Sequence, residues 1–159
     1  MERTGIFYYK YVTARAIADI CLVIQDHAKA FRLFKRLKKD CEYAKRYREK
    51  IYCYEQLGRT NREMRNYKDA VHSFKKMMNL AWAEKDIAQE TRAYENLAID
   101  YFYLGELDKA EYYHERFMRG KTENSLSIAK NVAINQIKQK RKLRMMDLSV
   151  QEGARKRKD

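Results

Sequence analysis

The sequence predicts an all-α solenoid of about three helix pairs, followed by a capping helix and a basic tail. The main observation is a repeat, because short motifs recur 40 residues apart, and a period of this size is typical of solenoid arrays. The second is composition, since the 159 residues contain no proline and only five glycines. The third is spacing, since apolar residues recur every three or four positions, as on one helix face.

Two marks align the copies, a Leu-Gly-like pair and a later alanine: Ile17-Ala18, Leu57-Gly58 and Leu97-Ala98, then Ala30, Ala70 and Ala110. Small residues at both marks let two antiparallel helices approach closely. Each pair has apolar surface on both flanks, so it must stack on its neighbours to bury it. We therefore predict that residues 1–122 hold three repeats, at about 5–42, 43–83 and 84–122.

Each repeat is predicted to contain two helices, in order 12–24 and 26–39, 42–64 and 67–83, then 87–104 and 107–120. Asp26 is expected to be an N-cap, because its side-chain oxygen can accept an otherwise unpaired N–H. Gly105 and Gly120 are expected to stop helices.

Beyond the third repeat, residues 122–124 read as a loop, and a capping helix is predicted from 125 to 146, within a segment 123–147. Residues 148–159 lose the helical period and gain charge, so we predict a basic tail that is disordered in isolation.

The charge is uneven along the chain, with a net value of +13. Residues 29–50 and 130–159 each hold ten Lys and Arg against three acidic residues. Such segments are attracted to acidic partners: a protein surface like that of tubulin, nucleic acid or anionic lipid. The residues predicted to anchor to an acidic surface are Lys38, Lys39, Lys45, Arg46, Lys138, Lys140, Arg141, Lys142 and Arg144.

Catalytic, metal and membrane functions find no support in the sequence. There is no P-loop, no HExxH and no Ser-His-Asp spacing, so we expect no enzyme and no cofactor. The three cysteines form no CxxC pair, and the histidines lie far from ligand spacing. Buried, reduced thiols predict an intracellular protein. No apolar run of about 18 residues and no secretory signal is present.

Between residues 9 and 122 the repeat resembles the tetratricopeptide repeat (TPR). The family pattern has a large residue, Leu-Gly and an aromatic on the first helix, then Ala, Phe and a small or apolar residue on the second. Besides the two marks above, the matching positions are Ala14, Tyr54 and Tyr94; Cys21, Asn61 and Tyr101; Phe34, Phe74 and His114; and Leu37, Met77 and Phe117. The period of 40, rather than about 34, and the missing proline are departures. Such variants are similar to Pins-type adaptors, kinesin light chains and ciliary TPR proteins, which implies a right-handed solenoid.

The resemblance also implies where a partner binds, since TPR arrays hold peptides or helices in a groove lined by their first helices. Mapping that groove here gives Arg15, Asp19, Leu22, Glu55, Gln56, Arg59, Arg62, Arg92, Glu95, Asn96, Ile99 and Phe102. Asn96 matches an asparagine that bonds a ligand backbone, and Arg59 and Arg92 suit ligand carboxylates. A chaperone-tail carboxylate clamp does not fit, because Asp19 would repel it.

We therefore expect a non-enzymatic scaffold, within a larger assembly such as the cytoskeleton or a ciliary axoneme. The alternative is an RNA-binding helical repeat, with Tyr43, Tyr47 and Tyr52 in the basic segment able to stack on bases. Membrane binding through 138–158 is disfavoured, because the segment lacks a large aromatic apolar face. Residues 6–12 are unusually apolar for an array end, which predicts that a partner, a second copy or upstream repeats cover them.

Overall fold

The computed structural model describes residues 2–155, with side-chain burial for 5–123, 125–126, 132 and 134–146. This part of the chain is all-α, as predicted, and forms six helices: α1 (Glu2–Val23), α2 (His27–Tyr43), α3 (Tyr47–Glu63), α4 (Tyr67–Ala83), α5 (Ile87–Tyr103) and α6 (Leu107–Arg155). The chain divides into two units, Met1–Lys121 and Thr122–Asp159. The repeats belong to the first unit.

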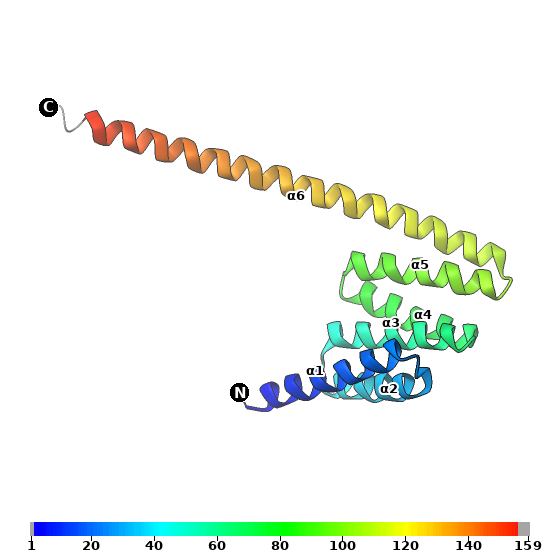
Figure 1. Ribbon diagram of the computed structural model, residues 1–159. Helices are drawn as coiled ribbons and strands as arrows, with labels where there is room; N and C mark the ends of the chain where they lie inside the picture. Colours follow the sequence, from blue (N-terminus) through cyan, green and yellow to red (C-terminus); the bar gives the residue numbers. More distant parts are fainter. Residues whose placement is uncertain (1, 156–159) are drawn as a thin grey trace. The chain divides into compact units, whose positions relative to one another are not determined.

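The helices of the first unit pack consecutively, each on the next from α1 to α5 (Figure 1). They alternate between first helices (α1, α3 and α5) and second helices (α2, α4 and the start of α6). α3 also contacts α5 directly, so neighbouring first helices share one side of the stack. We call this side the α1–α3–α5 face, and it corresponds to the predicted groove.

The turns between helices repeat every 20 residues. Helices α2 to α5 are each 17 residues long. A left-handed residue follows each of the first five helices: Gln25, Lys45, Arg65, Lys85 and Gly105, with φ between 52° and 76°. The next N–H then bonds the carbonyl five residues back, as from Asp26 to Cys21 at 2.8 Å, a Schellman-type ending. The sequence period of 40 is therefore two equal structural steps.

The predicted N-cap is confirmed, since Asp26 accepts a hydrogen bond from the Lys29 backbone N–H at 3.0 Å. Asp86 caps α5 in the same way, through the N–H of Gln89 at 3.1 Å. Each of these residues also ends the preceding turn, so one residue closes a helix and starts the next.

The core confirms the role of the small residues. Phe74 is fully buried, and a Cβ added to Gly58 would lie 2.5 Å from its ring. Ala18, Ala30 and Ala70 are fully buried as well. The two helices of a repeat can therefore approach closely only because these positions carry little or no side chain.

Several predicted boundaries are wrong, and the first is the start of α1, which lies at Glu2 rather than near residue 12. α2 extends to Tyr43, and α3 starts at Tyr47 rather than near 42, because the left-handed turn falls at Lys45. α6 continues through Gly120 and the predicted loop at 122–124. A Cβ on Gly120 would lie 2.2 Å from Thr91 Oγ1, so this glycine permits a close approach of α5 and does not end a helix.

The predicted tail is also helical up to Arg155, and residues 156–159 lie outside the described part. Residues 125–155 contain no proline and many good helix formers, including lysine, arginine, glutamine, leucine and methionine. Helix propensity therefore outweighs the loss of an apolar period.

Candidate protein-interaction face

The residues predicted to bind a partner divide by exposure on the α1–α3–α5 face. Arg59, Arg92, Glu95, Ile99 and Phe102 are exposed, and Phe102 is 64% exposed. The half-buried members are Arg15, Asp19, Leu22 and Arg62, and the buried members are Glu55, Gln56 and Asn96. The first group is the most open to a ligand, although Ile99 is only 37% exposed.

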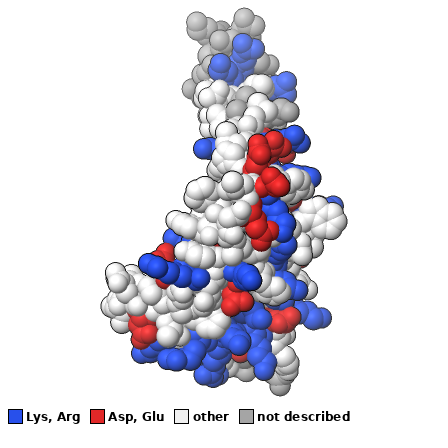
Figure 2. All heavy atoms as spheres, turned by 90° about the vertical axis from the view of Figure 1, so that its right-hand side faces the viewer, with Lys and Arg blue, Asp and Glu red and all other residues white. Residues whose placement is uncertain are grey.

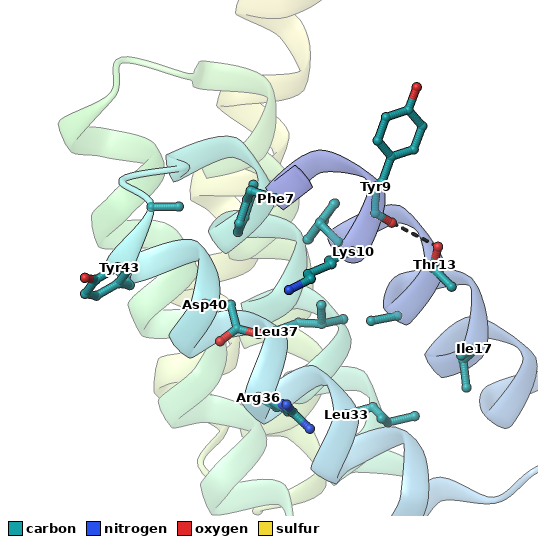
Figure 3. Close-up of a pocket in the computed structure, with 13 residues that line it drawn as sticks. Phe7, Tyr9, Lys10, Thr13, Ile17, Leu33, Arg36, Leu37, Asp40 and Tyr43 are labelled. Atoms are coloured by element: carbon teal, nitrogen blue, oxygen red, sulfur yellow. Dashed lines mark hydrogen bonds between the residues drawn. The ribbon is translucent and has the colours of Figure 1, made fainter. Parts of the chain in front are cut away.

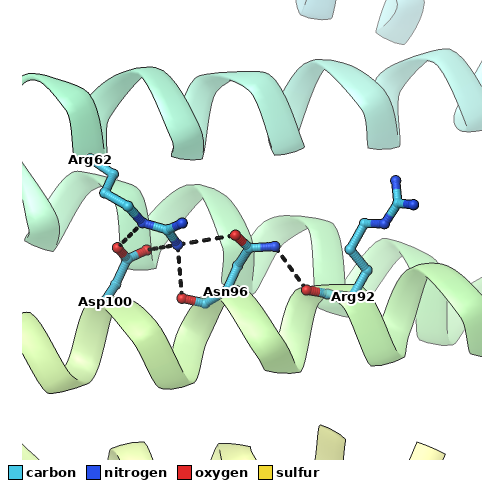
Figure 4. A network of polar contacts seen from close by, with 4 residues as sticks. All are labelled: Arg62, Arg92, Asn96 and Asp100. Atoms are coloured by element: carbon cyan, nitrogen blue, oxygen red, sulfur yellow. Dashed lines mark hydrogen bonds and ion pairs between the residues drawn. The ribbon is translucent and has the colours of Figure 1, made fainter. Parts of the chain in front are cut away.

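Arg62 joins α3 to α5 through a buried polar network (Figure 4). Its Nε donates to Asp100 Oδ1 at 2.6 Å and its Nη2 to Asp100 Oδ2 at 3.1 Å. The same Nη2 donates to the backbone oxygen and to Oδ1 of Asn96, both at 3.0 Å. The Asp100 side chain is fully buried, and the guanidinium carbon of Arg62 lies 5.1 Å from the centre of the Phe74 ring. The network fixes the spacing of two neighbouring repeats.

Burial and pairing act on the Asp100 carboxyl in opposite directions. Removal from water raises its pKa, and the hydrogen bonds and charge of Arg62 oppose that rise. The pKa is raised overall, which shows that desolvation is the larger effect. A lone buried carboxylate would be costly here, so Asp100 depends on Arg62.

Asn96 serves the same network. Its side-chain oxygen accepts from Arg62, and its Nδ2 donates to the backbone oxygen of Arg92 at 2.9 Å (Figure 4). Ligand binding by Asn96, implied by the TPR resemblance, stays a prediction. In this structure its polar groups already have partners within the array.

A second polar contact recurs between successive first helices. Arg92 Nη1 of α5 lies 3.4 Å from Glu55 Oε2 of α3. Forty residues earlier, the Tyr52 hydroxyl of α3 donates to Asp19 Oδ1 of α1 at 2.7 Å, and Arg15 lies over the Tyr52 ring at 3.8 Å. Tyr52 and Arg92 therefore occupy equivalent positions, and each contacts a carboxylate of the preceding first helix, although Asp19 and Glu55 are not equivalent.

The part of the face available to a partner is centred on α3 and α5. Arg59 is exposed, and no ion pair is found for it among the described residues. Phe102 packs edge-on to Tyr103, with 6.1 Å between ring centres, and both rings are largely exposed. Together with Glu95 and Ile99, these residues offer a cation, an anion and apolar surface on a framework held by Arg62.

The basic segments are also exposed in large part. Figure 2 shows Lys and Arg side chains gathered at its lower end, where α1 and α2 lie. Lys39 and Lys45 are exposed, whereas Lys38 and Arg46 are half-buried beside the rings of Tyr54 and Phe7. In the second unit the predicted anchoring residues are all exposed: Lys138, Lys140, Arg141, Lys142 and Arg144.

Other site types are not found in the described part of the chain. No group of three or more His, Cys, Asp or Glu there could hold a metal ion. None of its helices is long and apolar enough to span a membrane. Cys21, Cys41 and Cys53 are free and buried, in agreement with their prediction as core residues.

The comparisons with known proteins add evidence on the fold. No family model matches the sequence, and no curated protein matches it. Among solved structures the chain is similar to the TPR domain of Arabidopsis FLU, with a TM-score of 0.69 at 20% identity. The likeness covers 74% of this chain and 98% of that one. The fold is that of a TPR domain. The narrower resemblance to Pins-type adaptors, kinesin light chains or ciliary proteins stays a prediction.

Sequence reasoning did not identify the role of Asp100. A signal was present, because Asp100 lies within the apolar stripe formed by Leu97, Tyr101 and Leu104. A carboxylate at such a position is buried and needs a partner. Tyr52 was considered for base stacking, but its ring is half-buried and its hydroxyl is bonded to Asp19.

Proposed function

We propose that this chain is a non-enzymatic protein-interaction scaffold whose α1–α3–α5 face docks a peptide or helix of a partner protein. The observation that carries the proposal is the contrast within this face. The side chains of Arg62, Asn96 and Asp100 hydrogen-bond to one another and join the repeats. Arg59, Glu95 and Phe102 lie on the same helices but are exposed, and no such bond between repeats is found for them among the described residues. A rigid framework that presents exposed charged and aromatic groups suits binding.

The partner we propose for this face carries a carboxylate near an apolar side chain. Arg59 can donate two parallel hydrogen bonds to a carboxylate, and Phe102 and Ile99 can contact the apolar group. The basic segments would then anchor the scaffold to an acidic protein surface within a larger assembly. A cytoskeletal or ciliary setting rests on the resemblance and on charge.

The test compares Arg59→Glu with a matched charge reversal outside the face, Lys76→Glu on α4. Lys76 is exposed and belongs to a second helix. Wild type and both variants would be used as bait in cell lysate, with quantitative mass spectrometry of the retained proteins. We expect Arg59→Glu and Phe102→Ala to lose a shared set of partners that Lys76→Glu keeps. If all baits retain the same proteins, the face does not dock a partner.

RNA binding is the second candidate, and the exposed aromatic surface beside the basic residues of α2 favours it. Tyr43 is 93% exposed and Tyr47 45% exposed, next to Lys39 and Lys45. Stacking on these rings would give binding that persists at physiological salt, whereas charge alone would not. Titration of labelled single-stranded RNA at about 50 and 200 mM salt, with wild type and Tyr43→Ala, separates binding by stacking from binding by charge alone.

A further inference from the structure

α1 exposes a face that the equivalent helices bury. At the repeat offset of 40, Ile17 corresponds to Leu57 and Leu97. Ile17 is 45% exposed, whereas Leu57 is 6% and Leu97 0% exposed. One turn later Ile20 is 59% exposed, whereas its equivalents Thr60 and Asp100 are fully buried, and Asp100 pairs there with Arg62 of the preceding first helix. This face lies on a different side of α1 from Arg15 and Asp19, so it is distinct from the proposed function.

Inside the array a second helix covers the positions equivalent to Ile17. α2 packs on α3, and α4 packs on α5. Leu57 and Leu97 share their core clusters with two large apolar side chains spaced three residues apart on the covering helix, which are Phe34 and Leu37, then Phe74 and Met77. In the described part of the chain no helix precedes α1. The array itself therefore shows what the exposed face fits, which is an amphipathic helix.

A pocket of about 780 Å³ lies beside this face, between α1 and α2 (Figure 3). Its lining includes Ala14, which stands where the later repeats have Tyr54 and Tyr94. The ring of Tyr94 stacks on Tyr113, whose repeat equivalent, Leu33, also lines the pocket. Alanine in place of tyrosine therefore leaves a space that a large side chain of a docked helix can fill.

The charges around the pocket select the kind of helix. Lys10 and Arg36 line it together with the single acid Asp40, and Lys10 reaches from α1 toward α2 (Figure 3). Helical spacing places the exposed side chains of Arg32 and Lys39 beside Arg36. None of these four basic side chains forms an ion pair with a described residue. An apolar floor with a basic rim is complementary to an apolar helix flanked by acidic residues.

A second copy of the chain is a poor occupant. Joining two such ends would bring two basic rims together, which is repulsive. The start of α6 also offers a less complete apolar stripe, although Ala110 and Phe117 match Ala70 and Met77. Its equivalents of the buried α4 residues Val71, Phe74 and Ala81 are the exposed residues Glu111, His114 and Lys121.

We propose that this open end, formed by α1 and α2, binds an amphipathic helix of a partner protein on α1, in the position that α2 takes on α3 and α4 takes on α5. The helix inserts a large apolar side chain into the pocket at Ala14. Its acidic flank faces Lys10 and Arg36.

A peptide based on α4 is a suitable probe, because α4 covers the equivalent face of α5. We would label a synthetic peptide of residues 67–83 in which Lys68, Lys75 and Lys76 are replaced by Glu, and titrate it with the whole chain by fluorescence polarisation. A second peptide with Phe74→Ser and Met77→Ser added tests the apolar contact.

Variants of the whole chain test the site. Ile17→Glu/Ile20→Glu removes the apolar face, and Ala14→Tyr fills the pocket. Val23→Glu is the matched control, since Val23 is 82% exposed and the second repeat has Glu63 there.

We expect the acidic peptide to bind wild type and Val23→Glu equally. Its affinity should fall at least tenfold for Ile17→Glu/Ile20→Glu, for Ala14→Tyr and for Lys10→Glu/Arg36→Glu. The serine-substituted peptide should bind at least tenfold more weakly. Circular dichroism checks folding, and Ala14→Tyr should melt no lower than wild type. No saturable binding, or equal binding to the Ile17→Glu/Ile20→Glu variant, overturns the proposal. Sedimentation that shows a dimer of the chain, lost in that variant, also overturns it, because the occupant would then be a second copy.

Discussion

Arg62 and Asp100 form a buried ion pair at the junction of α3 and α5, whereas the described residues form none at the equivalent junction of α1 and α3. Forty residues earlier the same two positions are Leu22 and Thr60. Thr60 is fully buried too, but its hydroxyl donates to the Gln56 backbone oxygen of its own helix at 2.6 Å. The same two positions are therefore filled by an ion pair at one junction and by the uncharged residues Leu22 and Thr60, the apolar solution, at the other.

The apolar solution should be transferable to the second junction. Arg62→Leu alone leaves Asp100 buried without a cation, which should lower the free energy of unfolding by about 3 kcal/mol. Adding Asp100→Thr recreates the residues of the first junction and should bring stability back to within about 1 kcal/mol of wild type. Urea denaturation of the three proteins measures both values. A double variant no more stable than the single one would show that the pair does more than fill this junction.

The left-handed turns predict a stabilising substitution. Lys85 has a φ of 56°, which strains any residue with a Cβ, and its side chain is exposed. We expect Lys85→Gly to stabilise the fold by about 0.5–1 kcal/mol, after allowing for the greater freedom of glycine in the unfolded chain. Lys76→Gly, inside α4, is the control and should destabilise by about 1 kcal/mol. Thermal melts would decide it, and a lower melting temperature for Lys85→Gly would contradict the strain argument.

The contact of Tyr52 with Asp19 predicts a loss of stability at high pH. Burial, and then the hydrogen bond and charge of Asp19, raise the pKa of Tyr52 to about 12 from its usual 10.0. The folded state therefore holds this proton more tightly than the unfolded state. Its contribution is complete below about pH 10 and is lost as the pH rises toward about 12.

Asp19→Ala removes two of the causes of that shift and should lower the pKa of Tyr52. The measurement is the ultraviolet titration of tyrosinate in each protein, with the matching Tyr52→Phe variant subtracted to isolate this one ring. The same titration curve for Tyr52 with and without Asp19 would mean that burial alone sets the pKa.

The sequence predicted those features that depend on side-chain size at a regular spacing. The helix pairs, the small residues at Ala30, Ala70 and Gly58 and the buried Phe74 all follow from the period of 40. Features that depend on backbone conformation were not visible, since Lys45 and Lys85 carry no mark of a left-handed turn. The pairing of Arg62 with Asp100 also escaped, because it joins residues 38 positions apart on different helices.

Gly120 and Gly105 were both predicted to end helices, and the structure gives them different roles. Gly105 has a φ of 76° and nothing within 4 Å of an added Cβ, whereas Gly120 lies within α6 and faces Thr91. Alanine at Gly120 gains about 1 kcal/mol of helix propensity but overpacks the contact, which costs about 1–3 kcal/mol. We expect Gly120→Ala to destabilise wild type by about 1 kcal/mol. In a Thr91→Ala background the loss should be smaller but not reversed, because the Cβ that alanine keeps still lies 3.1 Å from the added Cβ. A four-protein denaturation cycle measures this difference. If Gly120→Ala has the same effect in both backgrounds, Thr91 is not the reason for the glycine.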